Sequence, residues 1–150
     1  MSGDAGLWHL ETAGELLVKL RSDYDRMQQE PRNPSPVYDF FVTAYHMHEW
    51  AARTEAEKRA LEAEPLIRVA GEIGTRAKHL RADNPKWVQL VGMGSRMPGP
   101  LSGTPRGIPT ALWVALQDPS CTPLERGRVS ALDLAQCLIE RWTRWINEGR

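Results

Sequence analysis

Two histidines, a glutamate and a tryptophan fall within AYHMHEW, residues 44–50 of the chain. On a helix each residue turns the chain by about 100°, so His46 and Glu49 lie one turn apart on the same side. A carboxylate beside an imidazole fixes the tautomer of the ring, which is what a general acid or base needs. His46 and Glu49 are therefore candidate catalytic residues, although a purely structural network would show the same pattern.

The other residues of this segment divide into a polar and an apolar side. Asp39, Thr43 and Arg53 fall on the side of His46 and predict a polar ladder around it. His48 falls opposite, among small and apolar residues, and we expect a packed histidine that makes one hydrogen bond. Because both sides also carry large apolar groups, the helix is expected to be central in the fold.

A second group of ionisable residues follows in GEIGTRAKHLR, residues 71–81. Gly71 and Gly74 each weaken a helix by about 1 kcal/mol relative to alanine, and they predict the close approach of a backbone or a ligand. If this helix packs beside the first, two histidines could meet in one acid–base cluster. The predicted cluster comprises His46, Glu49, Glu72, Arg76, Lys78 and His79.

The alternative to that cluster is a rim of exposed ion pairs, each of which contributes little to stability. In this interpretation Glu72, Arg76 and His79 flank the apolar stripe of their helix. Metal and cofactor motifs do not occur: the sequence has no Glu-x-x-His, no HExxH, no Cys/His finger spacing and no phosphate-binding loop. We therefore predict no metal and no cofactor, with a mononuclear site from His46, His79 and a carboxylate as the alternative.

The elements that would position these residues are mostly helices. Apolar residues at steps of three and four predict a first helix over residues 5–30, with Glu15, Lys19 and Asp23 on its other side. PRNPSP at 31–36 ends it, and Ser35 is expected to cap the second helix with Pro36 at its first position. Thr54 and Glu57 form a capping box that opens a short charged helix.

The second half of the chain combines helices with a β-ribbon. A helix is expected from Pro65 to Asn84-Pro85, and Ser130 with Asp133 opens the last helix. Between them, KWVQLVG (86–92) and ALWVALQD (111–118) are rich in β-formers and predict two strands. The glycine- and proline-rich loop at about 93–110 separates them. The sequence thus predicts a mainly α protein: a single domain, residues 1–150, built as a four- to five-helix bundle with a two-stranded antiparallel hairpin before the last helix.

Charge and hydropathy restrict the functional classes. Nineteen basic and nineteen acidic residues cancel, so RNA binding is possible but is not supported by the net charge. The start of the sequence has no signal-peptide pattern, and the longest apolar run, residues 111–116, is too short to cross a bilayer. We therefore expect a cytoplasmic protein that does not contact a membrane.

The combination of FFVTAYHMHEW with IGTRAKHLR, followed by a ribbon and a Trp-rich helix, resembles a group of uncharacterised bacterial and phage-borne proteins with TAxHxxEW and GxxAKH motifs. The resemblance covers about residues 35–146. In overall shape the chain is similar to the HEPN superfamily of helical bundles, which includes ribonuclease toxins and phage-defence proteins that act as dimers. The chain departs from the ribonuclease pattern because no histidine follows an arginine by four to six residues.

Two functions from different classes follow. In the first, the chain is a protein-interaction module, most simply a homodimer, as in the toxin and phage-defence systems that the resemblance implies. In the second, it is a divergent HEPN-like ribonuclease or another acid–base enzyme, in which His46 and His79 move protons and Arg76 or Lys78 stabilises developing charge.

Overall fold

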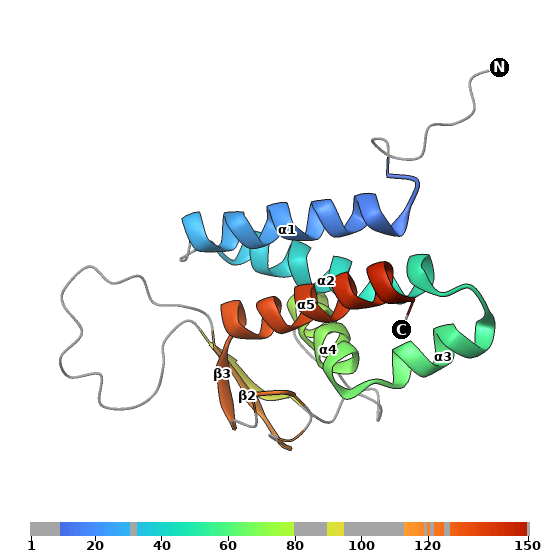
Figure 1. Ribbon diagram of the computed structural model, residues 1–150. Helices are drawn as coiled ribbons and strands as arrows, with labels where there is room; N and C mark the ends of the chain where they lie inside the picture. The colour runs from blue at the N-terminus through green and yellow to red at the C-terminus, as the bar shows by residue number, and fades with distance from the viewer. Residues whose placement is uncertain are drawn as a thin grey trace.

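The computed structural model describes residues 10–30, 33–79, 90–94, 113–118, 120, 122–124 and 127–149, and only the backbone of 76–79, 90–94 and 113. The elements in this part of the chain are α1 (Ala13–Gln29), α2 (Pro34–Ala51), α3 (Glu55–Ala63), α4 (Pro65–His79), β1 (Leu90–Gly94), β2 (Trp113–Leu116), β3 (Arg128–Ser130) and α5 (Ala131–Glu148). The predicted mainly α fold is confirmed, with an antiparallel hairpin before the last helix (Figure 1).

The sheet is larger than the predicted hairpin. β1 pairs with β2, and β2 pairs in turn with β3, both in antiparallel register. The third strand is only three residues long and runs directly into α5, which is why a pattern of alternating residues did not reveal it. β1 is described from Leu90, so residues 86–89 of the first predicted strand lie outside the described residues, as does most of the predicted 93–110 loop.

Side-chain caps fix where the helices begin. Thr54 accepts from the Glu57 amide at 3.1 Å and Ser130 accepts from the Asp133 amide at 3.0 Å, which confirms both predicted starts. The predicted cap of α2 was wrong. Asn33 is the capping residue, because its side chain accepts from the Ser35 amide and Pro34 occupies the first helical position, where a missing N–H costs nothing.

The first helix also begins later than predicted. Thr12 and Glu15 form a reciprocal capping box, so α1 starts at Ala13 and Leu10 precedes the helix. Residues 1–9 lie outside the described part of the chain, as does the predicted end of α4 at Asn84-Pro85. These shifts concern only where the helices begin and end.

α2 is the central element, because it packs against α1, α3, α4 and α5. This confirms the expectation drawn from its two apolar sides. One cluster of buried side chains joins all five helices and two of the strands. It contains Leu16, Leu17, Leu20, Met27, Val37, Phe40, Phe41, Ala44, Met47, Leu61, Leu66, Ile67, Val69, Ala70, Ile73, Val114, Leu116, Val129, Ala131, Leu134, Ala135, Leu138 and Trp142.

The last helix closes the bundle through polar as well as apolar contacts. The indole N–H of the fully buried Trp142 donates to the Ala44 carbonyl at 2.9 Å, which joins α5 to the middle of α2. Arg141 binds both carboxylate oxygens of Glu64 between α3 and α4. In Figure 1, α5 crosses in front of α2 and α4, and the sheet continues from its N-terminal end.

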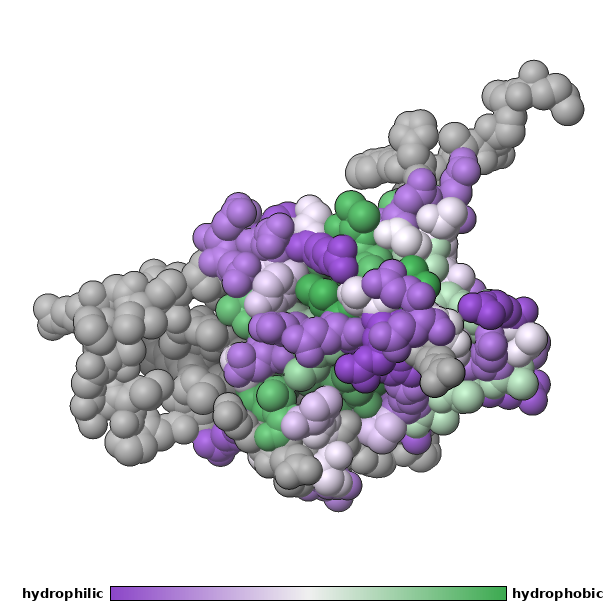
Figure 2. Space-filling model, viewed as in Figure 1, coloured by the Kyte–Doolittle hydropathy of each residue, from purple (hydrophilic) through white to green (hydrophobic). Residues whose placement is uncertain are grey.

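The visible face of the molecule is mixed in character. Figure 2 shows hydrophilic residues along α5 and α1, with smaller hydrophobic patches between them and near the sheet. Among the described residues, Val18 and Trp50 are the large hydrophobic side chains that remain exposed. No helix in this part of the chain is long and apolar enough to span a bilayer.

Candidate functional site

A pocket of about 220 Å³ opens between α2 and α4. It is lined by Tyr38, Val42, Tyr45 and His46 from α2 and by Gly71, Gly74 and Thr75 from α4. The aromatic side chains share one side of α2, because positions 38, 42, 45 and 46 follow the helical repeat. His46, predicted as a site residue, therefore borders a cavity.

The two glycines of α4 explain why a cavity forms here. A Cβ on Gly74 would lie 3.1 Å from Cγ2 of Val42 and 3.6 Å from its Cα, so the backbones approach closely at this point. This confirms the predicted close approach at Gly74. Gly71 and Gly74 add no side chain to the pocket they line, and the Thr75 hydroxyl donates back to the Gly71 carbonyl at 2.8 Å. The pocket is therefore lined by small residues from α4 and by larger, mostly aromatic residues from α2.

The imidazole of His46, which lines the pocket, faces the carboxylate of Glu49. Nδ1 of His46 lies 3.5 Å from Oε2 of Glu49, and the two side chains are 50% and 46% exposed. A pair this exposed contributes little to stability, so its main physical effect is to orient the imidazole. With Nδ1 turned toward the carboxylate, Nε2 is the ring nitrogen left to exchange a proton with a bound group.

Tyr45 connects the pocket to α3. Its hydroxyl donates to Oε1 of Glu62 at 2.9 Å, and its ring meets the His46 ring edge-on with centroids 5.2 Å apart. Burial raises the pKa of the Tyr45 hydroxyl above its usual value, and the bond to Glu62 and the charges of Glu62 and Glu49 act in the same direction. The Arg68 guanidinium opposes them.

His48 has the packing role that was expected of it. It is buried in the core, and its Nδ1 contacts the backbone carbonyl of Tyr45 one turn earlier in α2. The Tyr45 and His48 rings lie 4.9 Å apart between centroids. His48 therefore packs against the ring of the pocket residue Tyr45 from the core.

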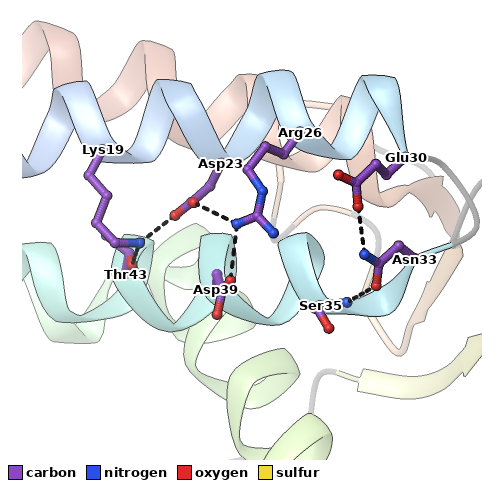
Figure 3. A network of polar contacts seen from close by, with 8 residues as sticks. All are labelled: Lys19, Asp23, Arg26, Glu30, Asn33, Ser35, Asp39 and Thr43. Carbon is purple, nitrogen blue, oxygen red and sulfur yellow. Dashed lines mark hydrogen bonds and ion pairs between the residues drawn. The ribbon is translucent and has the colours of Figure 1, made fainter.

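The predicted polar ladder around His46 is wrong, because its members face different partners. Asp39 and Thr43 point to α1, where they bind Arg26 at 3.3 Å and Lys19 at 3.1 Å (Figure 3). The Arg53 guanidinium lies beside Gly149, at the end of α5. Of the carboxylates assigned to the ladder, only Glu49 pairs with His46 within the described residues.

At the centre of the α1–α2 network lies Asp23, which sequence analysis placed on the outer side of its helix. The side chain is instead buried, with the residue 5% exposed, and its carboxylate contacts Lys19 and Arg26 (Figure 3). The signal was present in the spacing, because Asp23 falls in step with Leu20 and Met27 on the buried stripe. A charge is accepted there because two cations flank it.

Glu72 also differs from its expected place on a polar rim. The residue is 1% exposed, so it belongs to the buried side of α4 rather than to a surface cluster beside His46. Arg76, Lys78 and His79 end α4, and their side chains lie outside the described residues. Their predicted convergence with His46 and Glu49 stays a prediction.

The backbone of the helix crossing does not favour that convergence. Val42 packs on Gly74. Tyr45, which follows Val42 in α2, lies near Glu62 and Arg68, and both of these precede Gly74 in the sequence. The two helices therefore pass each other in opposite directions. His46 follows Val42 by one turn and His79 follows Gly74 by more than one turn, so they leave the crossing on opposite sides.

Four pocket residues were not predicted as part of a site: Tyr38, Val42, Tyr45 and Thr75. The spacing of tyrosines 38 and 45, seven residues apart and next to His46, was the available signal. Within the described part of the chain, no three His, Cys, Asp or Glu residues are placed to hold a metal ion. Comparisons with protein-family models, with curated proteins and with solved structures found no match for this chain.

Proposed function

We propose that the protein is a protein-interaction module that binds a partner polypeptide through the pocket between α2 and α4. The observation that carries the proposal is the pocket itself, which has a volume of about 220 Å³ and is lined by Tyr38, Tyr45 and His46 on its α2 side. Small-molecule sites usually enclose roughly 300–1,000 Å³, so this volume suits one inserted side chain better than a whole cofactor. Aromatic side chains around such a pocket are typical of interface hot spots.

Trp50 extends this surface. It lies four residues after His46 on α2, and 43% of its surface is exposed. Tryptophan is enriched at contact surfaces because a large apolar ring and one N–H donor are offered together. The pocket and the tryptophan form adjacent parts of one side of α2, and we call them, with Glu49, the α2–α4 surface.

The experiment is a selection of random phage-displayed peptides on the immobilised protein. Thr75→Phe places a ring in the pocket, whereas Gln136→Phe places the same ring at an exposed position of α5 and serves as the control. We expect the selected peptides to bind Thr75→Phe roughly tenfold more weakly than the wild type or the control. Equal binding to all three proteins would contradict the proposal.

The expected partner is a second copy of the chain. Zero net charge leaves no long-range repulsion between copies, and Trp50 supplies an exposed apolar contact. Sedimentation velocity over a range of concentrations should then show a dimer that Trp50→Ser dissociates. Val18→Ser, at the exposed apolar residue of α1, is the matched control and should leave the dimer intact. A monomer at all concentrations would contradict self-association.

The second candidate function is acid–base catalysis, which the contact between His46 and Glu49 at the pocket edge favours. As a ribonuclease, the protein would cleave single-stranded RNA, and His46→Ala would abolish the cleavage while leaving the unfolding free energy nearly unchanged, because the side chain is half exposed. The interaction proposal expects no cleavage above that of a buffer control. A fluorescence-quenched RNA substrate distinguishes the two.

A further inference from the structure

We infer that Trp50 of one copy of the chain enters the pocket between α2 and α4 of a second copy, and that the second copy does the same in return. The inference rests on the proposed function, in which a second copy is the expected partner, and it names the side chain that fills the pocket. It follows from the exposure of Trp50, from the size and lining of the pocket, and from the positions of both on α2.

Trp50 is a large aromatic side chain that its own chain leaves partly in solvent. It is 43% exposed, and it is not among the residues that line the pocket. Tryptophan is enriched at the hot spots of interfaces, because one side chain buries a large apolar area and also offers an N–H donor. Val18, the other exposed large hydrophobic residue of the described chain, is smaller and lies on α1, away from the pocket. Trp50 is therefore the better candidate for insertion.

The pocket suits an indole ring in size and in chemistry. A cavity of roughly 150 Å³ is enough to hold benzene, so a pocket of about 220 Å³ has room for the larger indole. The rings of Tyr38, Tyr45 and His46 can meet it edge-on or in an offset stack. Their phenol oxygens and imidazole can accept its N–H, as a buried indole requires. Gly71 and Gly74 add no side chain that would compete for the space.

Trp50 and the pocket are placed so that two copies can exchange them. Val42, which lines the pocket, lies four residues before His46 on α2, and Trp50 lies four residues after it. Both positions lie within about 40° of His46 around the helix. When two copies of a helix pair antiparallel about a two-fold axis, positions equally far from the axis on either side lie opposite each other. An axis at His46 therefore places each Trp50 against Val42 of the other copy, and both insertions form together.

The charges along this side of α2 pair in the same register. Arg53 and Asp39 lie seven residues on either side of the axis, and Glu49 and Thr43 lie three residues on either side. The Lys19 ammonium lies 3.1 Å from the Thr43 hydroxyl, so it would face Glu49 of the second copy. Asp39 and Lys19 already have partners within their own chain, but their side chains are 39% and 37% exposed and can be reached. Opposite charges thus favour the antiparallel register, while each exposed pair adds little affinity.

The test supplies Trp50 to an open pocket from a second chain. ¹⁵N-labelled Trp50→Ser keeps an open pocket and has no tryptophan to insert. Unlabelled Thr75→Phe is the donor, because it keeps Trp50 while its own pocket is closed, and the double variant Trp50→Ser with Thr75→Phe is the control donor. Binding is followed by ¹H–¹⁵N NMR at the Gly71, Gly74 and Thr75 amides of the labelled chain. We expect Thr75→Phe to shift these amides and to bind roughly tenfold or more tightly than the control donor.

The wild type is a second donor, so the test does not depend on the folding of Thr75→Phe. The Thr75→Phe donor and its control differ only at position 50, and equal shifts from both would overturn the inference. If neither donor that carries Trp50 shifts these amides while a selected phage-displayed peptide still requires the open pocket, the inference fails and the proposed function stands. If no selected peptide requires the pocket, the proposed function fails as well.

Discussion

At the scale of single residues, Asp23 shows how a charge can belong to the interior of this fold. The carboxylate is buried between α1 and α2, and it contacts Lys19 and Arg26, which remain partly exposed. We expect Asp23→Asn to lower the free energy of unfolding by about 1–2 kcal/mol, because hydrogen bonds to a charged group are weakened in a buried site. Asp25→Asn, at an exposed position of α1, should change it by less than about 0.5 kcal/mol. Urea denaturation measures both, and equal effects would contradict the assignment.

Tyr45 gives a prediction about alkaline pH. Its folded-state pKa is raised, chiefly by burial and by the Glu62 carboxylate that its hydroxyl binds. The neutral phenol therefore contributes stability that is fully present below the unfolded pKa of about 10 and is lost as the pH rises further. We expect the wild type to lose more stability between pH 9 and pH 11 than Tyr45→Phe does, as measured by urea denaturation at each pH. A loss of the same size in both proteins would show that this hydroxyl has no part in it.

Some of the site residues could be found from the sequence, and others could not. The i, i+3 spacing of His46 and Glu49 was enough to bring them together, because their contact lies within one helix. Contacts between helices could not be predicted in this way. Whether Asp39 meets His46 or Arg26 depends on the rotation of α2 against α1, and no local pattern reports that rotation. Glu72 was misplaced for the same reason, since burial of its side of α4 depends on elements far away in the sequence.

At the scale of elements, the crossing of α2 over α4 depends on Gly74. Gly14→Ala in α1 should raise the unfolding free energy by up to about 1 kcal/mol, because the nearest atom to a Cβ there is 3.8 Å away. Gly74→Ala should gain less or destabilise, since its Cβ meets Val42 at 3.1 Å. Thermal unfolding of both variants checks the difference.

A double-mutant cycle makes the same prediction sharper. Combining Gly74→Ala with Val42→Ala removes the methyl group that the new Cβ meets, so we expect the pair to be more stable than the sum of its parts by about 0.5 kcal/mol or more. Purely additive effects would show that the helices have room to move apart. The two glycines of α4 were a clear signal in the sequence. No signal in the sequence showed that Val42 of α2 is the residue that packs against Gly74.

At the scale of the whole molecule, α5 holds the bundle closed. Trp142 is fully buried and donates to the Ala44 carbonyl, while Trp145 is partly buried and donates to the Ala51 carbonyl at 3.2 Å. We expect Trp142→Phe to lower the unfolding free energy by about 1–3 kcal/mol through a lost hydrogen bond and a small void. Trp145→Phe is the matched control and should cost less. Denaturant titration compares them, and the reverse order would show that Trp145 and not Trp142 makes the main closing contact.

The helical architecture was predictable because each helix carries its own apolar repeat and most carry their own caps. The three-stranded sheet was only partly predictable. β2 pairs with both neighbours, so its partners are decided by tertiary contacts, and the three residues of β3 are too few to establish an alternating pattern.

Ser130 is both the last residue of β3 and the residue whose hydroxyl caps α5. No linker separates strand from helix, so there is no spare pair of backbone dihedrals at which the sheet could swing like a hinge. A force applied to the sheet would be transmitted directly to α5, the helix that carries Trp142. A partner bound to the sheet would therefore also act on the packing of α5 against α2.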